Sequence, residues 1–436
     1  MFDVSVISPN ALVVKISRSG DAPHITALTC PLVNIDALGP ILELQPSTGH
    51  KTHGTAHHGE IKMNTHALGA AAFLVVTSSA AYAVGLDRSG RPTGLIFESG
   101  NMLEFSAGYA DPSIDGTEED IGLGQLPTGN IADTFRIWGA GLRYELSDTL
   151  ALGVIIDEPY GADILYASSA PLLSGTAATV DSHAITGFAR YKFNENISAH
   201  GGIVYQSVSA DVTLRGAAYG GLSGYNAAFS NDSAVGYMIG AAYEIPQIAL
   251  RVALTYHSEI EHKMDTLETP PGASAITSTT EVTTPETIAV SFQSGIAADT
   301  LLFGSLRFSH YSATSVSPVG LRTITANPEA SLTDLENAWN AELGVGRRFN
   351  EKWAGSLSVG WEQKGEDDLV SPLGATNGAT FVSVGASYQA TETIKISGGI
   401  RYTDFGAALP STSGAQRGTF DGNSAVSAGL KVQISF

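Results

Sequence analysis

Apolar and polar residues alternate along much of the chain, and this period of two limits its fold more than any other feature. In the last segment the residues of one parity are all apolar: Val426, Ala428, Leu430, Val432, Ile434 and Phe436. Successive side chains of a β-strand point to opposite faces, so this pattern predicts a strand with one apolar and one polar face. Fourteen such segments lie near residues 102–110, 134–146, 149–158, 180–193, 197–210, 233–245, 247–260, 285–297, 300–311, 338–349, 353–364, 379–389, 393–404 and 424–436.

The connections between these segments alternate in length. The short ones are Ser147-Asp148, Asn194-Glu195-Asn196, Pro246-Gln247, Ala298-Asp299, Asn350-Glu351-Lys352 and Thr391-Glu392. The intervening connections are loops of a dozen residues or more. A transmembrane β-barrel has short periplasmic turns and long outer loops, whereas a soluble sandwich gives no reason for this order. We therefore expect an all-β fold, a 14-stranded antiparallel transmembrane β-barrel over residues 102–436, with both ends of the barrel in the periplasm.

The two faces of the segments agree with this fold. The apolar parity carries the rings of Tyr109, Trp138, Tyr144, Tyr191, Tyr205, Tyr243, Tyr256, Phe308, Trp339, Phe349, Trp353, Trp361, Tyr388 and Tyr402. Such rings suit a membrane interface. The opposite parity carries Glu104, Arg143, Arg190, Lys192, Arg251, Arg307, Glu342, Arg348, Glu362, Lys395 and Arg401, which a lumen tolerates and lipid does not. A secreted soluble β-protein is the alternative, but its apolar face would need a partner sheet.

Composition excludes several other classes of protein. Only 15% of the 436 residues are charged, against about a quarter in a soluble protein. The formal net charge of −20 disfavours nucleic acid as a partner. The single cysteine, Cys30, excludes a disulfide framework and a thiolate metal site. We expect no cofactor and no metal, and the histidines between residues 50 and 58 do not change this expectation.

Residues 63–83 have the pattern of a signal peptide. Lys62 precedes the apolar run 67–76, and Ala81-Tyr82-Ala83 offers small residues for cleavage after Ala83. A transmembrane helix is the alternative, but the run is shorter than the roughly 18 to 20 residues that span a bilayer. A signal peptide must stand at the N-terminus, so residues 1–62 are expected to be an upstream extension from a start codon assigned too early, with Met63 the true start.

Residues 84–101 are too mixed in character for a strand and too long for a simple leader. The lumen of a large barrel leaks unless something fills it. Leu86, Leu95, Ile96 and Phe97 give this segment an apolar side that favours the barrel interior. We expect a hatch or plug, with a linker as the alternative.

Eight stretches of the chain form an ordered pattern: residues 85–90, 96–101, 103–106, 157–163, 243–246, 248–256, 284–286 and 371–378. In these stretches, and in their order, the chain resembles the FadL-type long-chain fatty acid transporters of the outer membrane, especially their alphaproteobacterial branch. The likeness covers residues 84–436. One departure is that the Asn-Pro-Ala hatch motif of enteric members is absent, with Arg91-Pro92-Thr93 nearby instead.

The resemblance implies passive transport in the outer membrane of a Gram-negative bacterium, by a barrel with an N-terminal hatch and a kinked third strand that opens sideways. It implies no enzymatic activity. Pro159 and Gly161 are the expected kink, since Pro has no donor for the ladder and Gly weakens it. The alternative is that Pro159 only starts the following loop. The expected partner is a long-chain fatty acid or another hydrophobic small molecule.

A carboxylate head group would need a cation, and a bidentate guanidinium suits it. Arg251 and Arg307 are the candidates for substrate binding, together with Leu86, Leu95, Ile96 and Phe97 for the apolar tail. The alternative role for Arg143, Arg190, Arg251 and Arg307 is ion pairing with lumen carboxylates such as Glu104 or Glu342.

Two other functions compete with uptake of a hydrophobic substrate. The first is a general porin or an adhesin, in which the acidic clusters 118–120 and 366–368 of the outer loops bind lipopolysaccharide through divalent cations. The second is an outer-membrane hydrolase, although His200, His257 and His310 show no Ser and Asp arrangement around them.

Overall fold

The computed structural model describes residues 2–8, 11–16, 86–166 and 170–436, in two compact units that divide after Met63. In the first unit, β1 (Phe2–Ser8) and β2 (Ala11–Ile16) form an antiparallel hairpin. The predicted signal peptide, its cleavage site, Cys30 and the histidines between residues 50 and 58 lie outside the described residues. The rest of the description concerns the second unit.

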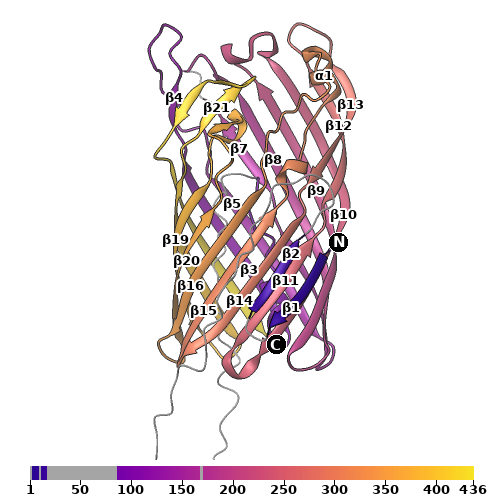
Figure 1. The fold of residues 1–436 in the computed structure, drawn as a ribbon, viewed down its shortest axis with the longest axis vertical. Helices are drawn as coiled ribbons and strands as arrows, with labels where there is room; N and C mark the ends of the chain where they lie inside the picture. Colours follow the sequence, from indigo (N-terminus) through magenta and orange to yellow (C-terminus); the bar gives the residue numbers. More distant parts are fainter. Residues whose placement is uncertain (1, 9–10, 17–85, 167–169) are drawn as a thin grey trace, which may run out of the picture. The chain divides into compact units, whose positions relative to one another are not determined.

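The second unit is a closed antiparallel barrel (Figure 1). In chain order its segments are β3 (Met102–Ser113), β5 (Phe135–Glu145), β6 (Leu150–Asp157), β7 (Gly161–Leu165), β8 (Ala177–Lys192), β9 (Ile197–Leu214), β10 (Tyr225–Ile245), β11 (Leu250–His257), β12 (Ile260–Thr269), β13 (Ile276–Thr284), β14 (Thr287–Ala297), β15 (Thr300–Ser309), β16 (Ala338–Arg348), β17 (Trp353–Glu362), β19 (Ala379–Gln389), β20 (Ile394–Phe405) and β24 (Ser424–Ser435). β6 continues into β7 and β11 into β12, because the members of each pair share a neighbouring strand, β8 and β10 respectively. β13 likewise continues into β14, because they pair with β12 and β11, the two parts of one strand. The wall therefore has fourteen strands, closed by the ladder between β24 and β3, and the predicted fold is confirmed.

The side chains of the wall separate as the alternation predicts. Large apolar side chains on one face are exposed, and aromatic rings among them lie near the two ends of the strands. Trp138, Trp339, Trp361 and Tyr402 lie toward the long loops, and Tyr144, Tyr191, Tyr243 and Trp353 toward the short turns. The inward face holds buried charges such as Arg143, Arg190 and Arg401. Such a wall presents apolar side chains to lipid and keeps its charges in the lumen.

Several strands extend farther beyond the long-loop end than predicted. β10 begins at Tyr225, and β12 and β13 form a hairpin where the sequence analysis expected a long loop. In β12 the buried parity includes His262, Thr266 and Glu268, while the exposed parity carries charges such as Glu261 and Lys263. An outward charged face is unsuited to lipid, so this hairpin stands in water beyond the membrane.

The outer loops carry short elements of their own. Two small sheets are among them: β4 (Gly116–Glu118) pairs with β23 (Gly418–Phe420), and β21 (Leu409–Thr412) pairs with both β18 (Leu369–Val370) and β22 (Ala415–Gln416). The loops also contain the α-helix α1 (Val319–Thr325) and the 3-10 turns η4 (Ala217–Leu222), η6 (Tyr311–Ala313) and η7 (Pro372–Gly374). A further turn, η5 (Pro246–Ile248), lies at the opposite end, between β10 and β11. Among the described residues, no helix is long and apolar enough to cross a membrane.

Two buried carboxylates hold these loops together. Glu118 accepts hydrogen bonds from the backbone N–H groups of Leu172 and Leu173, both at 2.7 Å. Glu268 accepts from the N–H groups of Gly320 and Leu321 at 2.8 Å and from the Tyr225 hydroxyl at 2.6 Å. Glu118 is 2% exposed, so it does not contribute to the acidic surface expected over residues 118–120.

We expect Glu268→Ala to release the loop that contains α1. The substitution leaves buried N–H and hydroxyl donors without an acceptor, at about 1–3 kcal/mol for each unsatisfied group. Limited proteolysis should then cut residues 310–337 faster than in the parent, while the barrel keeps its heat-modifiable mobility. Lys263→Ala is the matched control, because Lys263 is exposed on the same strand, and it should leave the digestion rate unchanged.

Candidate functional site

The N-terminal segment of residues 86–101 enters the barrel and packs against its inner wall. Its 3-10 turn η3 (Gly94–Phe97) buries Leu95, Ile96 and Phe97, with Ile96 fully inaccessible. They share an apolar cluster with Ile155, Phe188 and Met238 of the wall. A side chain at Gly141 of β5 would collide with Leu95, so the wall leaves room for the segment at that position.

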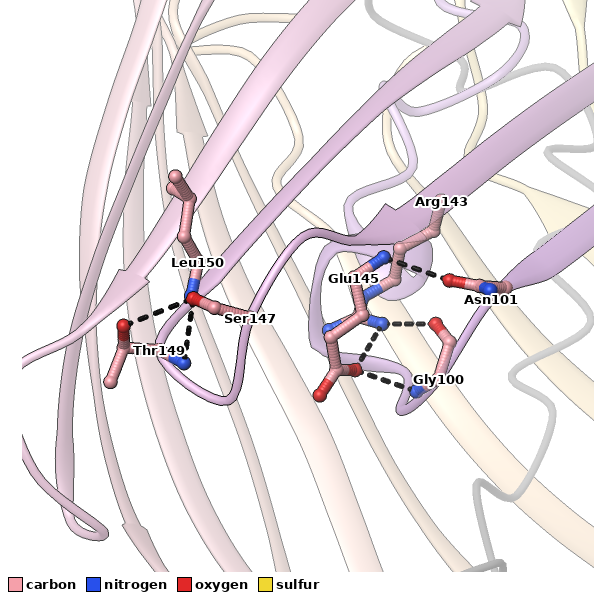
Figure 2. A network of polar contacts seen from close by, with 7 residues as sticks. All are labelled: Gly100, Asn101, Arg143, Glu145, Ser147, Thr149 and Leu150. Carbon is pink, nitrogen blue, oxygen red and sulfur yellow. Dashed lines mark hydrogen bonds and ion pairs between the residues drawn. The ribbon is translucent and has the colours of Figure 1, made fainter.

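The lower end of the segment is attached to β5 (Figure 2). The Gly100 N–H donates to Glu145 at 2.8 Å, and the Glu145 N–H donates to Asn101 Oδ1 at 2.9 Å. The buried Arg143 guanidinium bonds to the Gly100 carbonyl and pairs with Glu145 at 2.9 Å. Gly100 has a φ of +72°, a conformation that glycine adopts without strain. These contacts fix the point at which the segment turns into β3.

The third strand is broken where its sequence reads Glu158-Pro159-Tyr160. Below the break β6 pairs with β5 up to Ala140–Ile156, and above it the next pairing is the bridge Ala132–Ile164. Between these points, residues 134–139 and 157–162 form no ladder pair with each other, and we call this interruption of the wall the window. Pro159 has no N–H to donate, which favours a break at this position.

The N-terminal segment takes the place of β5 beside the broken strand. The Arg88 N–H donates to the Pro159 carbonyl and the Gly161 N–H donates to the Leu86 carbonyl, both at 2.8 Å. They flank an antiparallel bridge between Asp87 and Tyr160. The segment thus satisfies two backbone groups of the break from the lumen side, while the Tyr160 N–H donates to Ser182 Oγ of β8 at 2.7 Å.

Side chains strengthen this docking. Arg88 pairs with Asp163 at 2.6 Å, and Ser89 and Arg91 bond to Asp157 and Tyr160 respectively. These contacts join three positions of the break region, Asp157, Tyr160 and Asp163, to the segment.

Asp87 is the most buried charge of the segment, at 3% exposure. It forms an ion pair with Arg307 of β15 and accepts a hydrogen bond from the Tyr311 hydroxyl at 3.3 Å. Its other carboxylate oxygen accepts from the Gly90 N–H at 3.1 Å. A buried carboxylate is stable only with such partners. Asp87 therefore connects the broken third strand to β15.

The lumen arginines differ in their partners. Arg143 pairs with Glu145, Arg190 with Glu244 and Arg401 with Glu342 at 3.5 Å, so most of these cations are structural ion-pair partners. Arg307 is held by Asp87. Within the described residues Arg251 has no ion pair, and its guanidinium centre lies 4.6 Å from the centroid of the Phe97 ring. The two arginines that the sequence predicts for substrate binding thus line the same cavity but differ in their partners.

Two cavities lie on either side of the N-terminal segment. The outer one, of about 230 Å³, is lined by Leu86 to Arg88 and by apolar side chains of the upper wall and loops, including Phe135, Val208, Phe229, Met264, Leu332 and Phe405. The inner one, of about 240 Å³, is lined by Gly90 to Gly94, Phe97 and Glu98 and by Arg251, His257 and Phe381. A third cavity of about 80 Å³ lies at the window between the segment and the wall.

The comparisons with known proteins place this architecture. A family model described as outer membrane protein transport protein (OMPP1/FadL/TodX) matches residues 92–366, well over half of the chain. The chain belongs to this family. The OMPP1/FadL/TodX proteins are transporters of the Gram-negative outer membrane, and that is where this member acts.

Solved structures of the OMPP1/FadL/TodX family share the fold. A Pseudomonas aeruginosa FadL homologue has a TM-score of 0.65 at 16% identity, covering 82% of this chain and 96% of its own. The Pseudomonas putida toluene transporter TodX has a TM-score of 0.57 at 11% identity, covering 82% and 94%. The Ralstonia pickettii toluene transporter TbuX has a TM-score of 0.53 at 16% identity, covering 82% and 95%. No curated protein matches the chain.

Proposed function

We propose that this protein carries long-chain fatty acids or similar hydrophobic compounds passively across the outer membrane. The N-terminal segment acts as a hatch between the outer and inner cavities, and the window is the lateral route to the lipid. The observation that carries the proposal is the position of this one segment, which lines both cavities and contacts the broken strand.

The outer cavity has the chemistry of a capture site. Its apolar lining comes from several strands and from the loops between β15 and β16 and between β17 and β19. Burying an alkyl chain there gains about 0.8 kcal/mol per methylene. A long tail therefore supplies enough affinity without a specific polar contact. Leu86 contributes to this cavity.

The inner cavity offers a site for a carboxylate head group. Arg251 lines it without an ion-pair partner among the described residues, and Phe97 covers one face of the guanidinium. Arg307 lines the same cavity but is paired with Asp87, so a ligand carboxylate would have to displace Asp87. Leu95, Ile96 and Phe97 hold the hatch against the wall, and movement of this turn would open a path past Arg251.

The lateral route passes between β5 and the broken third strand. Pro159 and Gly161 bound the break, and the hatch residues Ser89, Pro92 and Leu95 line the window from within. A substrate that displaced these residues would meet the outward side chains of the wall. It would then reach the outer leaflet without crossing water, which suits a molecule of low solubility.

Uptake of labelled oleate tests the proposal. The chain is expressed from Met63 in a Gram-negative host that lacks its own fatty acid uptake protein, and insertion is checked by heat-modifiable mobility. Restored uptake supports the proposal. Correct insertion without uptake of oleate refutes the fatty acid assignment, and labelled toluene then tests the substrate named for two of the solved relatives.

Arg251→Gln is expected to weaken uptake of a carboxylate substrate selectively. A hydrogen bond to a charged group contributes about 1.5–3 kcal/mol, so half-saturation by oleate should rise about tenfold or more. Oleyl alcohol, which has the same tail without the charge, is the matched ligand and should enter at the parent rate. An equal loss for both ligands would show that Arg251 only supports the fold.

A further inference from the structure

The window exposes one edge of β5 to the break. In the register set by Ala140–Ile156, Trp138 stands directly opposite Glu158. The Glu158 backbone does not pair with Trp138, but its side chain accepts a hydrogen bond from the Trp138 N–H at 3.2 Å. Within the described residues, this is the hydrogen bond that crosses the window between residues 134–139 and 157–162. A carboxylate thus occupies the position that a strand carbonyl would have.

The second carboxylate oxygen of Glu158 contacts β8. It lies 3.5 Å from His183 Nδ1, whose side chain is 58% exposed, whereas the Glu158 side chain is 15% exposed. One carboxylate therefore touches strands on both sides of the third strand.

Next to this contact, the window cavity reaches residues of both faces of the wall. The window cavity is lined both by inward residues such as Ser106 and Lys431 and by the outward side chains of Trp138 and Leu430, which are 52% and 53% exposed. A path through the wall at this height is closed from the lumen by the hatch, at Pro92 and Leu95, and at the rim by the Glu158 contact.

From this geometry we infer that Glu158 is the latch of the window, a positioning residue whose carboxylate holds the β5 edge to the broken strand. The inference rests on the proposed lateral route. Release of the Trp138 N–H separates the two edges without breaking any ladder pair, because none exists there. The closed state of the window therefore depends on one side chain as well as on the hatch.

A cysteine probe at the window tests the latch without any substrate. Ser106→Cys is suitable because Ser106 Oγ lies beside Gly139 at the window, and a chain expressed from Met63 has no other cysteine. The purified protein is placed in liposomes and treated with a pyrene maleimide dissolved in the lipid. Adding Glu158→Ala should raise the labelling rate about tenfold. A loss of about 1.4 kcal/mol in the free energy that favours the closed window raises the open fraction by a factor of ten.

Two variants separate the latch from a general loss of structure. Glu158→Gln keeps an acceptor for the Trp138 N–H and should label at a rate between those of the parent and Glu158→Ala. His183→Ala removes the other contact of Glu158 and should label at the parent rate. Labelling of Glu158→Ala at the parent rate, in barrels with normal heat-modifiable mobility, would overturn the latch.

Uptake is measured separately on the same variants. Faster labelling of Glu158→Ala in a protein that takes up no hydrophobic substrate would support the latch and refute the proposed function. Unchanged labelling in a protein that takes up oleate normally would refute the latch and leave the function standing.

Discussion

Deletion of residues 86–98 is expected to convert the barrel into a conducting pore. The deleted residues line both cavities, while the contacts of Gly100 and Asn101 with β5 are kept. A barrel of this strand number leaves an interior that side chains of the wall do not fill by themselves. In planar bilayers the variant should show stable open-channel conductance, and the parent should show little.

Deletion of an exposed loop is the control, because it shortens the chain without removing residues that line the cavities. Residues 121–124 are exposed in the loop between β4 and β5, and their removal should leave the conductance of the parent unchanged. Unchanged conductance after loss of residues 86–98 would favour a linker over a hatch, and high conductance of the parent itself would favour a general porin.

Asp87→Ala should release the hatch with almost as large an effect. Removal of one partner from a buried ion pair costs about 3–5 kcal/mol, because the other charge stays buried. Asp87 is 3% exposed, and its loss removes one ion-pair partner from Arg307 and one acceptor from Tyr311. The hatch should become sensitive to added protease, and transient channel openings should appear in bilayers.

Asp163→Ala is the matched control for this effect. Asp163 forms the ion pair of the same segment with Arg88, but its side chain is 36% exposed. The Asp163 carboxylate reaches water, although the Arg88 side chain is only 10% exposed, and Arg88 keeps the Phe135 ring at 4.4 Å, so the hatch should lose less protection than in Asp87→Ala. Equal protease sensitivity of the two variants would show that the segment is held by its backbone and apolar contacts.

The membrane part of the fold was predictable because lipid imposes one rule on every strand. Wherever the wall faces lipid, the large outward residues are apolar and the charged residues are mostly turned inward, as in β24, so strand number and short turns follow from the sequence. The rule does not apply above the membrane. In β12, Glu261 and Lys263 face outward and His262 faces inward. Because polar residues stand on both faces, the sequence shows no apolar alternation there and reads as a loop.

The candidate site was less predictable, because its contacts join residues that are far apart in sequence. Parity indicated that Arg251 and Arg307 face the lumen, but it could not show that Asp87 pairs with Arg307, or that Arg251 has no ion pair in the part of the chain that the structure describes. Sequence reasoning also missed Asp87, Asp163 and Glu158. Asp157, Glu158 and Asp163, close to Pro159 in the sequence, were a signal that could have been used. Charges next to a broken strand need partners outside the ladder, so these residues indicated contacts with another segment.

The course of the hatch also sets an order of events in biogenesis. Leu86 lines the outer cavity, well inside the barrel, and the segment reaches it by rising from the start of β3. Cleavage after Ala83, the site predicted from the sequence, would leave two residues before Leu86. An uncut chain would have to carry its whole leader through the same space. With the cleavage predicted from the sequence, removal of the leader is expected to come before the segment docks, which would make protease processing a checkpoint for barrel assembly.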